Sequence, residues 1–225
     1  MTRTAEQKMW TALVAGLVLI ALALFVTAGT IDYWQAWVYL GNVAVTSTLI
    51  TLRIVKDPRL LESRIKAGPT AEQRPRQKLI LTCTAVPMCA MYIVPGLDRR
   101  YDWSRVPTWL CIAGGVLIVV SMWMVDRVFN ENSFGAATVQ VTEGQKVITT
   151  GPYAIVRNPM YSGAAVYLVG LAFALGSYWT LIAAVLVILG LVWRLFDEEA
   201  LLKEELPGYV EYCDKVRWHL IPGVF

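Results

Sequence analysis

The chain has 225 residues, of which 56% are hydrophobic and only 16% are charged. Soluble globular domains contain about 45–50% apolar and about 25% charged residues, and disordered chains combine few apolar residues with many charges. The composition therefore excludes both classes and favours a bundle of membrane-spanning helices, each needing about 20 apolar residues. The net charge of +3 is small, and we expect no nucleic-acid partner.

Six apolar segments predict an all-α, polytopic membrane bundle of about six spans. They cover residues 10–30, 33–52, 79–97, 107–125, 161–175 and 179–196. The first holds no charge between residues 9 and 31, which is longer than the apolar core of a secretory signal, about 7–15 residues. We therefore expect a retained span. Pro87 and Pro95 predict kinks in the third segment.

The last two apolar segments are separated by only residues 176–178, which predicts an antiparallel helical hairpin. The fifth segment is short for a membrane span, so it is expected either to tilt or to stop partway. Gly170 and Ala174 lie four residues apart within it. Small residues at this spacing favour close helix approach.

The basic residues predict which side of the membrane each loop faces. Residues 53–78 contain eight lysines and arginines, which is typical of a cytoplasmic loop. With six spans, both termini and residues 126–160 lie on that side, together with 17 of the 20 lysines and arginines. Arg99, Arg100 and Arg105 lie on the other side. We therefore expect an integral membrane protein with cytoplasmic termini and a cytoplasmic active site.

Cysteine and histidine usage argues against a metal centre. The four cysteines form no CxxC pair, and His219 is the single histidine, so zinc, haem and iron–sulfur sites are not expected. Cys83, Cys89 and Cys111 lie in apolar runs, where we expect them to be buried small apolar residues.

Two polar clusters interrupt the apolar segments. Pro159 is predicted to begin the fifth helix, which puts Arg157 and Asn158 at a helix N-terminus, where free N–H groups favour anions. After the sixth segment, Arg194 and Glu198 are four residues apart and share a helix face. This second cluster is also compatible with an ordinary helix end carrying solvated charges. In a hairpin the two clusters meet at the cytoplasmic face, as a cofactor pocket requires.

Residues 145–163 resemble the signature of isoprenylcysteine carboxyl methyltransferases and related membrane phospholipid methyltransferases. The signature is a Gly-Pro-Tyr turn, here residues 151–153, followed by an Arg-His-Pro-x-Tyr box, here residues 157–161. Arg194, the Glu198-Glu199 pair and residues 207–222 fit its second half. The resemblance covers roughly residues 128–225. One position departs from it, because Asn158 stands where histidine is usual.

The resemblance implies a membrane-embedded methyltransferase that uses S-adenosyl-L-methionine and acts on a lipophilic or lipidated substrate. It implies catalytic roles for Arg194, on the substrate side, and for Arg157 and Asn158. Since asparagine cannot carry a proton, only a positioning role is expected of Asn158. The implied cofactor contacts are Gln140, Gln145, Lys146, Val147, Ile148, Tyr153, Asn158, Pro159, Met160, Tyr161, Glu198 and Glu199.

Methyl transfer from a sulfonium mainly needs positioning and the exclusion of water. Arg194 suits a carboxylate acceptor through a two-pronged hydrogen bond, and Glu198 suits the cofactor's α-ammonium. Tyr153 and Tyr161 are candidates for stacking on the adenine or facing the sulfonium, although without the motif interfacial anchoring is the favoured explanation of both tyrosines. Candidates for a lipid-substrate wall, or for plain helix packing, are Trp123, Phe129 and Phe134.

These expectations divide the chain into N-terminal transmembrane helices, residues 1–125, and a methyltransferase core, residues 126–225. O-methylation of an isoprenylcysteine-like carboxylate is the leading hypothesis. The alternatives are a phospholipid N-methyltransferase, a membrane NADPH-dependent reductase of the sterol-reductase type, and a non-catalytic protein that kept the fold.

Overall fold

The protein is described by a computed structural model, which places residues 2–56, 61, 74–132 and 146–225. Regular structure within these ranges is entirely helical, which confirms the predicted all-α class. The elements are α1 (Thr2–Ala28), α2 (Trp34–Lys56), α4 (Pro75–Tyr101), α5 (Thr108–Glu131), the 3₁₀ helix η1 (Gly151–Ala154), α6 (Pro159–Ala174), α7 (Thr180–Glu205) and α8 (Tyr209–Lys215).

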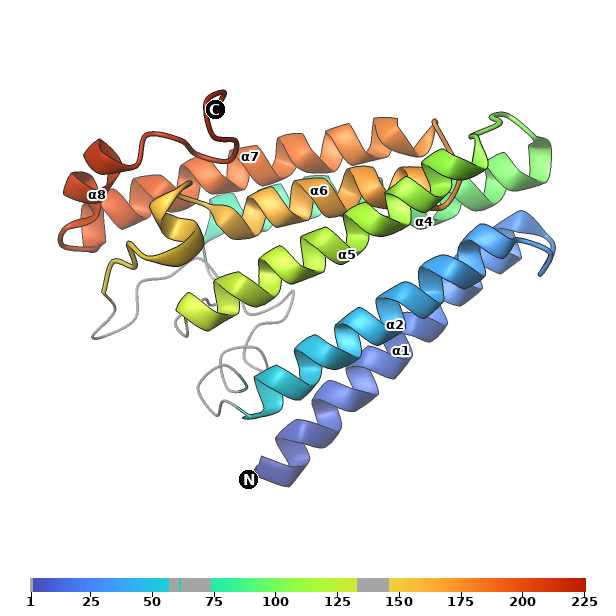
Figure 1. Ribbon diagram of the computed structural model, residues 1–225, viewed down its shortest axis with the longest axis horizontal. Coiled ribbons are helices and arrows are strands. Elements are labelled where there is room, and N and C mark those ends of the chain that lie inside the picture. Colours follow the sequence, from blue (N-terminus) through green and yellow to red (C-terminus); the bar gives the residue numbers. More distant parts are fainter. Residues whose placement is uncertain (1, 57–60, 62–73, 133–145) are drawn as a thin grey trace.

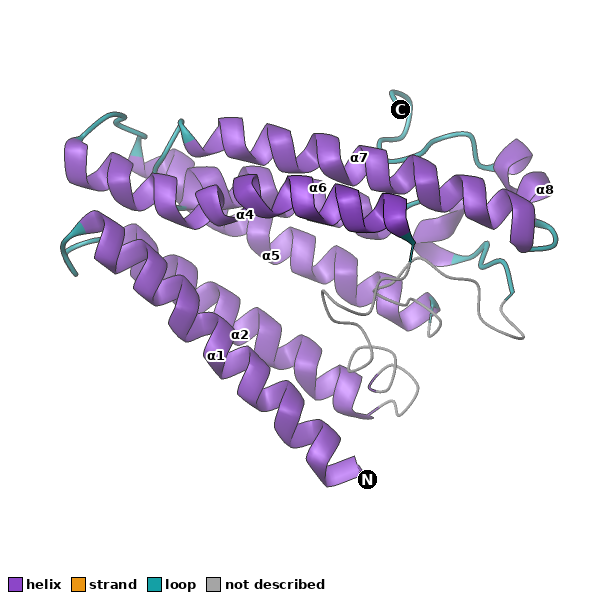
Figure 2. Ribbon diagram, turned by 180° about the vertical axis from the view of Figure 1, so that it is seen from behind, coloured by secondary structure: helices purple, strands orange, loops and turns teal. Residues whose placement is uncertain are grey.

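The long helices run up and down the bundle (Figure 1). Helix α5 packs along α6, α4 packs along α7, and α1 contacts both α2 and α4. Helices α1 and α2 diverge from the others toward the end of the bundle that holds the N-terminus, as both views show (Figures 1 and 2). Helices η1 and α8 lie at this same end (Figure 1). The polar C-terminal elements therefore share one end of the bundle with the N-terminus.

Five helices are long and apolar enough to cross a membrane: α1, α2, α4, α5 and α7. Helix α6 has 16 residues, or about 24 Å at 1.5 Å per residue, against a hydrocarbon core of about 30 Å. The Tyr33 hydroxyl nevertheless donates to the Leu175 carbonyl just after α6, so α6 reaches the turn before α2. A sixth crossing stays a prediction.

The outward face of α7 is a continuous apolar stripe. Its exposed side chains are Ile182, Val185, Leu186, Leu189, Trp193 and Phe196. Their spacing of three and four residues puts them on one helix face. Such a patch would be an aggregation risk in water, whereas it matches the hydrocarbon of a bilayer.

Helices α5 and α6 approach closely at glycines, as the spacing of Gly170 and Ala174 predicted. A Cβ atom on Gly170 would lie 2.9 Å from the Cβ of Leu117, and one on Gly114 would lie 2.4 Å from the backbone nitrogen of Ala174. Ser121 adds a hydrogen bond across the same interface, from its hydroxyl to the Gly163 carbonyl at 2.9 Å. Small residues thus set the position of α6, which begins at the polar cluster.

The predicted hairpin of α6 and α7 is confirmed, with Gly176 in the left-handed region at φ 72° within its turn. A buried carboxylate, Asp98, ties this turn to the one that follows α4. Asp98 accepts hydrogen bonds from the backbone N–H of Ser104 at 2.7 Å and from the Ser104 and Ser177 hydroxyls. Helix α4 continues through Pro87 and Pro95. The far end of the bundle is therefore held by a defined polar network.

Candidate functional site

The start of α6 and the polar end of α7 meet at the end of the bundle that holds α8. The Asn158 side-chain amide donates to Glu199 Oε1 at 2.7 Å, and the Tyr161 hydroxyl donates to Glu198 Oε2 at 2.6 Å. Arg194 Nε donates to the same tyrosine hydroxyl at 3.1 Å. The predicted convergence of the two polar clusters is thereby confirmed in the structure.

The consecutive acids Asp197, Glu198 and Glu199 contact three different parts of the protein. Helical residues are rotated by about 100° from one to the next, so their side chains point in different directions. Asp197 faces α4, where it pairs with Arg74 Nη1 at 3.3 Å and accepts from Gln77. Glu198 faces Tyr161, and Glu199 faces the residues before α6. The interpretation as solvated charges is therefore wrong for Asp197 and Glu199, which are both buried.

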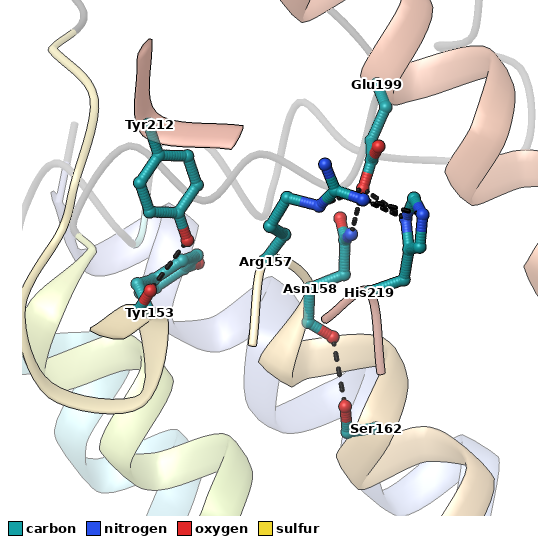
Figure 3. A network of polar contacts seen from close by, with 7 residues as sticks. All are labelled: Tyr153, Arg157, Asn158, Ser162, Glu199, Tyr212 and His219. Atoms are coloured by element: carbon teal, nitrogen blue, oxygen red, sulfur yellow. Dashed lines mark hydrogen bonds and ion pairs between the residues drawn. The ribbon is translucent and has the colours of Figure 1, made fainter. Parts of the chain in front are cut away.

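Glu199 is the centre of a buried network (Figure 3). Its Oε1 lies 2.7 Å from Asn158 Nδ2, 2.9 Å from His219 Nδ1 and 3.4 Å from Arg157 Nε. The side chains of Arg157 and Glu199 are only 8% and 3% exposed. A buried ion pair is tolerated when further hydrogen bonds support it. Here the amide and the imidazole contact the carboxylate, and the imidazole also contacts Arg157 Nη2, whereas Arg157 Nε makes no hydrogen bond within the described residues.

The C-terminal tail binds the start of α6 through its backbone. The N–H of Arg157 donates to the Trp218 carbonyl at 2.8 Å, and that of Asn158 donates to the His219 carbonyl at 3.0 Å. The Ser162 hydroxyl donates to the Leu220 carbonyl at 2.7 Å. The N–H groups of Arg157 and Asn158 are therefore not available to an anion, because tail carbonyls accept both.

Tyr153 lies beside the Arg157 network, on η1 (Figure 3). Its hydroxyl accepts a hydrogen bond from Asn132 Nδ2 at 2.9 Å, and its carbonyl accepts one from the Tyr212 hydroxyl at 2.7 Å. Burial raises the pKa of Tyr212 well above its ordinary value, with a further increase from nearby Tyr153. Burial likewise raises the pKa of Tyr209, helped by the negative charge of Glu199. Both phenols of α8 therefore stay protonated, and that of Tyr212 acts as a hydrogen-bond donor.

The other predicted cofactor residues are more dispersed. Val147 packs against the apolar cluster of Leu206, Tyr209 and Tyr212, which brings the segment of Lys146, Val147 and Ile148 beside α8. Pro159 is buried at the first position of α6. Met160 instead packs against the apolar cluster of Ile54, Leu61 and Phe129. Gln140 and Gln145 lie outside the described residues.

The candidate residues for a lipid-substrate wall do not lie together in the structure. Phe129 is buried in the cluster with Ile54, whereas Trp123 is exposed, with the Arg127 guanidinium 5.2 Å from its ring centroid. Phe134 lies outside the described residues. The structure thus puts Phe129 and Met160 together on the side of the site that faces α2.

The cysteine prediction is correct for one residue of three. Cys111 is buried, but Cys83 and Cys89 are exposed on α4, where the outer surface of the bundle is itself apolar. Sequence polarity does not distinguish a side chain that faces lipid from one that faces the core. Among the residues that the structure places, no cluster of three histidines, cysteines or acids is arranged to hold a metal ion.

Sequence reasoning missed His219, Asp197 and the tail as parts of this polar region. The partners of Asp197 lie about 120 residues earlier in the chain, so no local pattern identifies it. The one signal for His219 was its position within residues 207–222, which fit the family pattern.

Comparison with known proteins supports the resemblance that the sequence motifs carry. Residues 109–207, which run from α5 through α7, match the family described as phospholipid methyltransferase. A protein of Arabidopsis thaliana, protein-S-isoprenylcysteine O-methyltransferase B, is 29% identical over 128 residues. That alignment covers 54% of this chain and 61% of the relative. The chain therefore resembles membrane methyltransferases in the region that contains both halves of the site.

Proposed function

We propose that the protein is an integral membrane methyltransferase that uses S-adenosylmethionine to methylate a lipophilic acceptor, with an isoprenylcysteine-like carboxylate as its acceptor group. The observation that carries this proposal is the convergence of Asn158 and Tyr161 with Arg194, Glu198 and Glu199 at one end of an apolar bundle. The family match over α5 to α7 and the similarity to an isoprenylcysteine methyltransferase support it.

The residues on the cofactor side fit the chemistry of S-adenosylmethionine. Glu198 is half-buried and accepts a hydrogen bond from Tyr161, so its carboxylate is oriented to bind the α-ammonium group. The rings of Tyr153 and Tyr161 suit the adenine or the sulfonium. When bound, the cofactor supplies a methyl group already activated on sulfur. We assign the adenine contacts to residues 145–148 and further cofactor contacts to Gln140, Pro159 and Met160.

Arg194 is the proposed acceptor-binding residue. It lies on α7 one helical turn before Glu198, and its Nε donates to the Tyr161 hydroxyl. A guanidinium binds a carboxylate through two parallel hydrogen bonds, so the Arg194 side chain suits holding an acceptor carboxylate beside the methyl donor. A carboxylate nucleophile is already deprotonated at neutral pH, so the reaction requires no general base. This agrees with an asparagine at position 158.

We place this site in the C-terminal half, residues 126–225, at the cytoplasmic face. The basic residues of the segment 53–78 support this orientation, because positively charged loops face the cytoplasm. Trp193 and Phe196, on the exposed apolar face of α7, flank Arg194 in sequence, which supports an acceptor site beside lipid. A lipid-anchored acceptor would then approach within the membrane while the cofactor enters from water.

A phospholipid amine is the second candidate acceptor, because the matching family is described by that chemistry. The two acceptors differ in their charge: a carboxylate is attracted by the Arg194 guanidinium, whereas a cationic amine is repelled by it. Substitution of Arg194 therefore separates the two candidates.

The test is transfer of a labelled methyl group by the purified protein in lipid vesicles. One set of vesicles contains a farnesylated N-acetylcysteine, and the other contains phosphatidylethanolamine as the only acceptor. We expect label in the farnesylated acid, with at least a tenfold loss of kcat/KM in Arg194→Gln, since a charged hydrogen bond contributes about 1.5–3 kcal/mol. Label only in the phospholipid would favour the second candidate, and no label in either would contradict the proposal.

A further inference from the structure

We propose that His219 is a positioning residue of the site: a neutral imidazole, protonated on Nδ1, that orients Glu199 and Arg157 toward each other. Its predicted effect on cofactor affinity rests on the proposed function, whereas its hydrogen bonding does not. The chain contains no other histidine.

Hydrogen-bond chemistry selects one form of the ring. His219 Nδ1 lies 2.9 Å from Glu199 Oε1, and Arg157 Nη2 lies 2.6 Å from Nε2 and 2.9 Å from Nδ1, so Nε2 is its nearer ring nitrogen. A carboxylate only accepts hydrogen bonds, and a guanidinium only donates them. The neutral ring with hydrogen on Nδ1 satisfies both partners, since Nδ1–H donates to Glu199 and the Nε2 lone pair accepts from Arg157. The other neutral tautomer would turn the Nδ1 lone pair toward the Glu199 carboxylate and the Nε2–H toward the nearest guanidinium nitrogen, and an imidazolium would oppose the same N–H to the guanidinium.

The ring is also fixed by packing. It stacks on Phe225, with centroids 5.0 Å apart, and meets Phe196 edge to face at 5.5 Å. The backbone carbonyl of His219 accepts from the N–H of Asn158 at 3.0 Å. Residues of α7, of the tail and of the segment before α6 therefore hold the imidazole from three sides, so its orientation is set before any ligand binds.

This arrangement assigns distinct tasks to the polar groups around Glu199. Asn158 and His219 both donate to Oε1, while Arg157 supplies the positive charge. The tail thus provides an imidazole beside residues 157–161, in which Asn158 stands where histidine is usual. Without the ring nitrogens, Arg157 and Glu199 each lose a hydrogen-bond partner in a buried position. Because Glu198 is next to Glu199 on α7, its orientation toward the cofactor is then less well fixed.

The first test needs neither cofactor nor activity. Labelling the protein with ¹⁵N-histidine gives a single imidazole, so its two nitrogen resonances require no assignment by mutation. In detergent micelles near neutral pH we expect Nδ1 to show the shift of a protonated nitrogen and Nε2 that of an unprotonated one. Imidazole in water prefers hydrogen on Nε2. A spectrum dominated by Nε2–H or by the imidazolium would overturn the inference.

The second test uses a matched pair of substitutions. His219→Phe keeps an aromatic ring between Phe196 and Phe225 but removes both nitrogens, whereas His219→Gln keeps one donor and one acceptor. We expect the Kd for S-adenosylmethionine, measured by calorimetry, to rise about tenfold or more in His219→Phe and less than threefold in His219→Gln. Thermal unfolding in the same detergent checks that both variants fold.

The outcomes separate the two proposals. Wild-type affinity in a folded His219→Phe variant would overturn the positioning role. If the wild-type protein itself binds no S-adenosylmethionine, the proposed function fails, and the nitrogen spectrum still decides whether His219 orients Glu199 as a neutral Nδ1–H imidazole.

Discussion

Replacing Glu199 by alanine should cost more stability than any other single change among the acids of α7. The substitution leaves the Arg157 guanidinium, 8% exposed, without its counter-charge, and it removes the acceptor of Asn158 Nδ2 and His219 Nδ1. Removing one partner of a buried ion pair costs about 3–5 kcal/mol. On the scale of about 2–4 °C per kcal/mol for chains of this length, the melting temperature should fall by roughly 10 °C.

The assay is thermal unfolding of the purified protein in one detergent, followed by circular dichroism. Glu204→Ala is the matched control, because Glu204 lies on the same helix but is exposed; it should change the melting temperature by no more than about 1–2 °C. The double variant Arg157→Met, Glu199→Leu should recover only part of the loss, since it removes the uncompensated charge but leaves Asn158 Nδ2 and His219 Nδ1 without their acceptor. If Glu199→Ala and Glu204→Ala have the same melting temperature, the buried network does not hold the tail and α6 together, and the reasoning is refuted.

Three further predictions concern the rest of the bundle. Gly114→Ala should destabilise the protein by about 1–3 kcal/mol in reversible unfolding, because its Cβ would lie 2.4 Å from the Ala174 nitrogen, whereas Gly41→Ala, with nothing within 4 Å, should not; equal stabilities would contradict the close packing of α5 and α6. Asp98→Ala should lower the melting temperature by removing the acceptor of Ser104 and Ser177, yet leave the Kd for S-adenosylmethionine unchanged within twofold; a large change in Kd would show that the far end of the bundle is coupled to the site. Glu198→Ala should raise that Kd about tenfold or more, measured by calorimetry, with little loss of stability because Glu198 is half-buried; unchanged affinity would remove Glu198 from the cofactor site.

The sequence predicted the features that depend on local composition and on short spacings. The lengths of the apolar segments predicted the long helices, and the three-residue connection between the last two segments predicted the hairpin of α6 and α7. Once the hairpin is assumed, the meeting of Asn158 with the end of α7 follows from geometry. Gly170 was identified from its spacing alone, and the structure gives the reason: no Cβ fits beside Leu117.

The parts that the sequence did not predict depend on contacts between distant segments. Nothing local distinguishes Asp197, which anchors α4, from Glu198, which faces the site, because both are acids on one helical turn. The tail binds the start of α6 through its backbone carbonyls. Every residue has a backbone carbonyl, so such hydrogen bonds require no particular residue type and cannot be predicted from the sequence. His219 was a lone histidine with no metal-ligand spacing, so its role became visible only when Arg157 and Glu199 were found beside it.

The most direct test of the account is a calorimetric titration of the purified protein in detergent with S-adenosylmethionine, repeated with NADPH. We predict saturable binding of one S-adenosylmethionine per chain, weakened in Glu198→Ala, and no heat from NADPH beyond dilution. Binding of NADPH without binding of S-adenosylmethionine would contradict the methyltransferase account and favour a membrane reductase in its place.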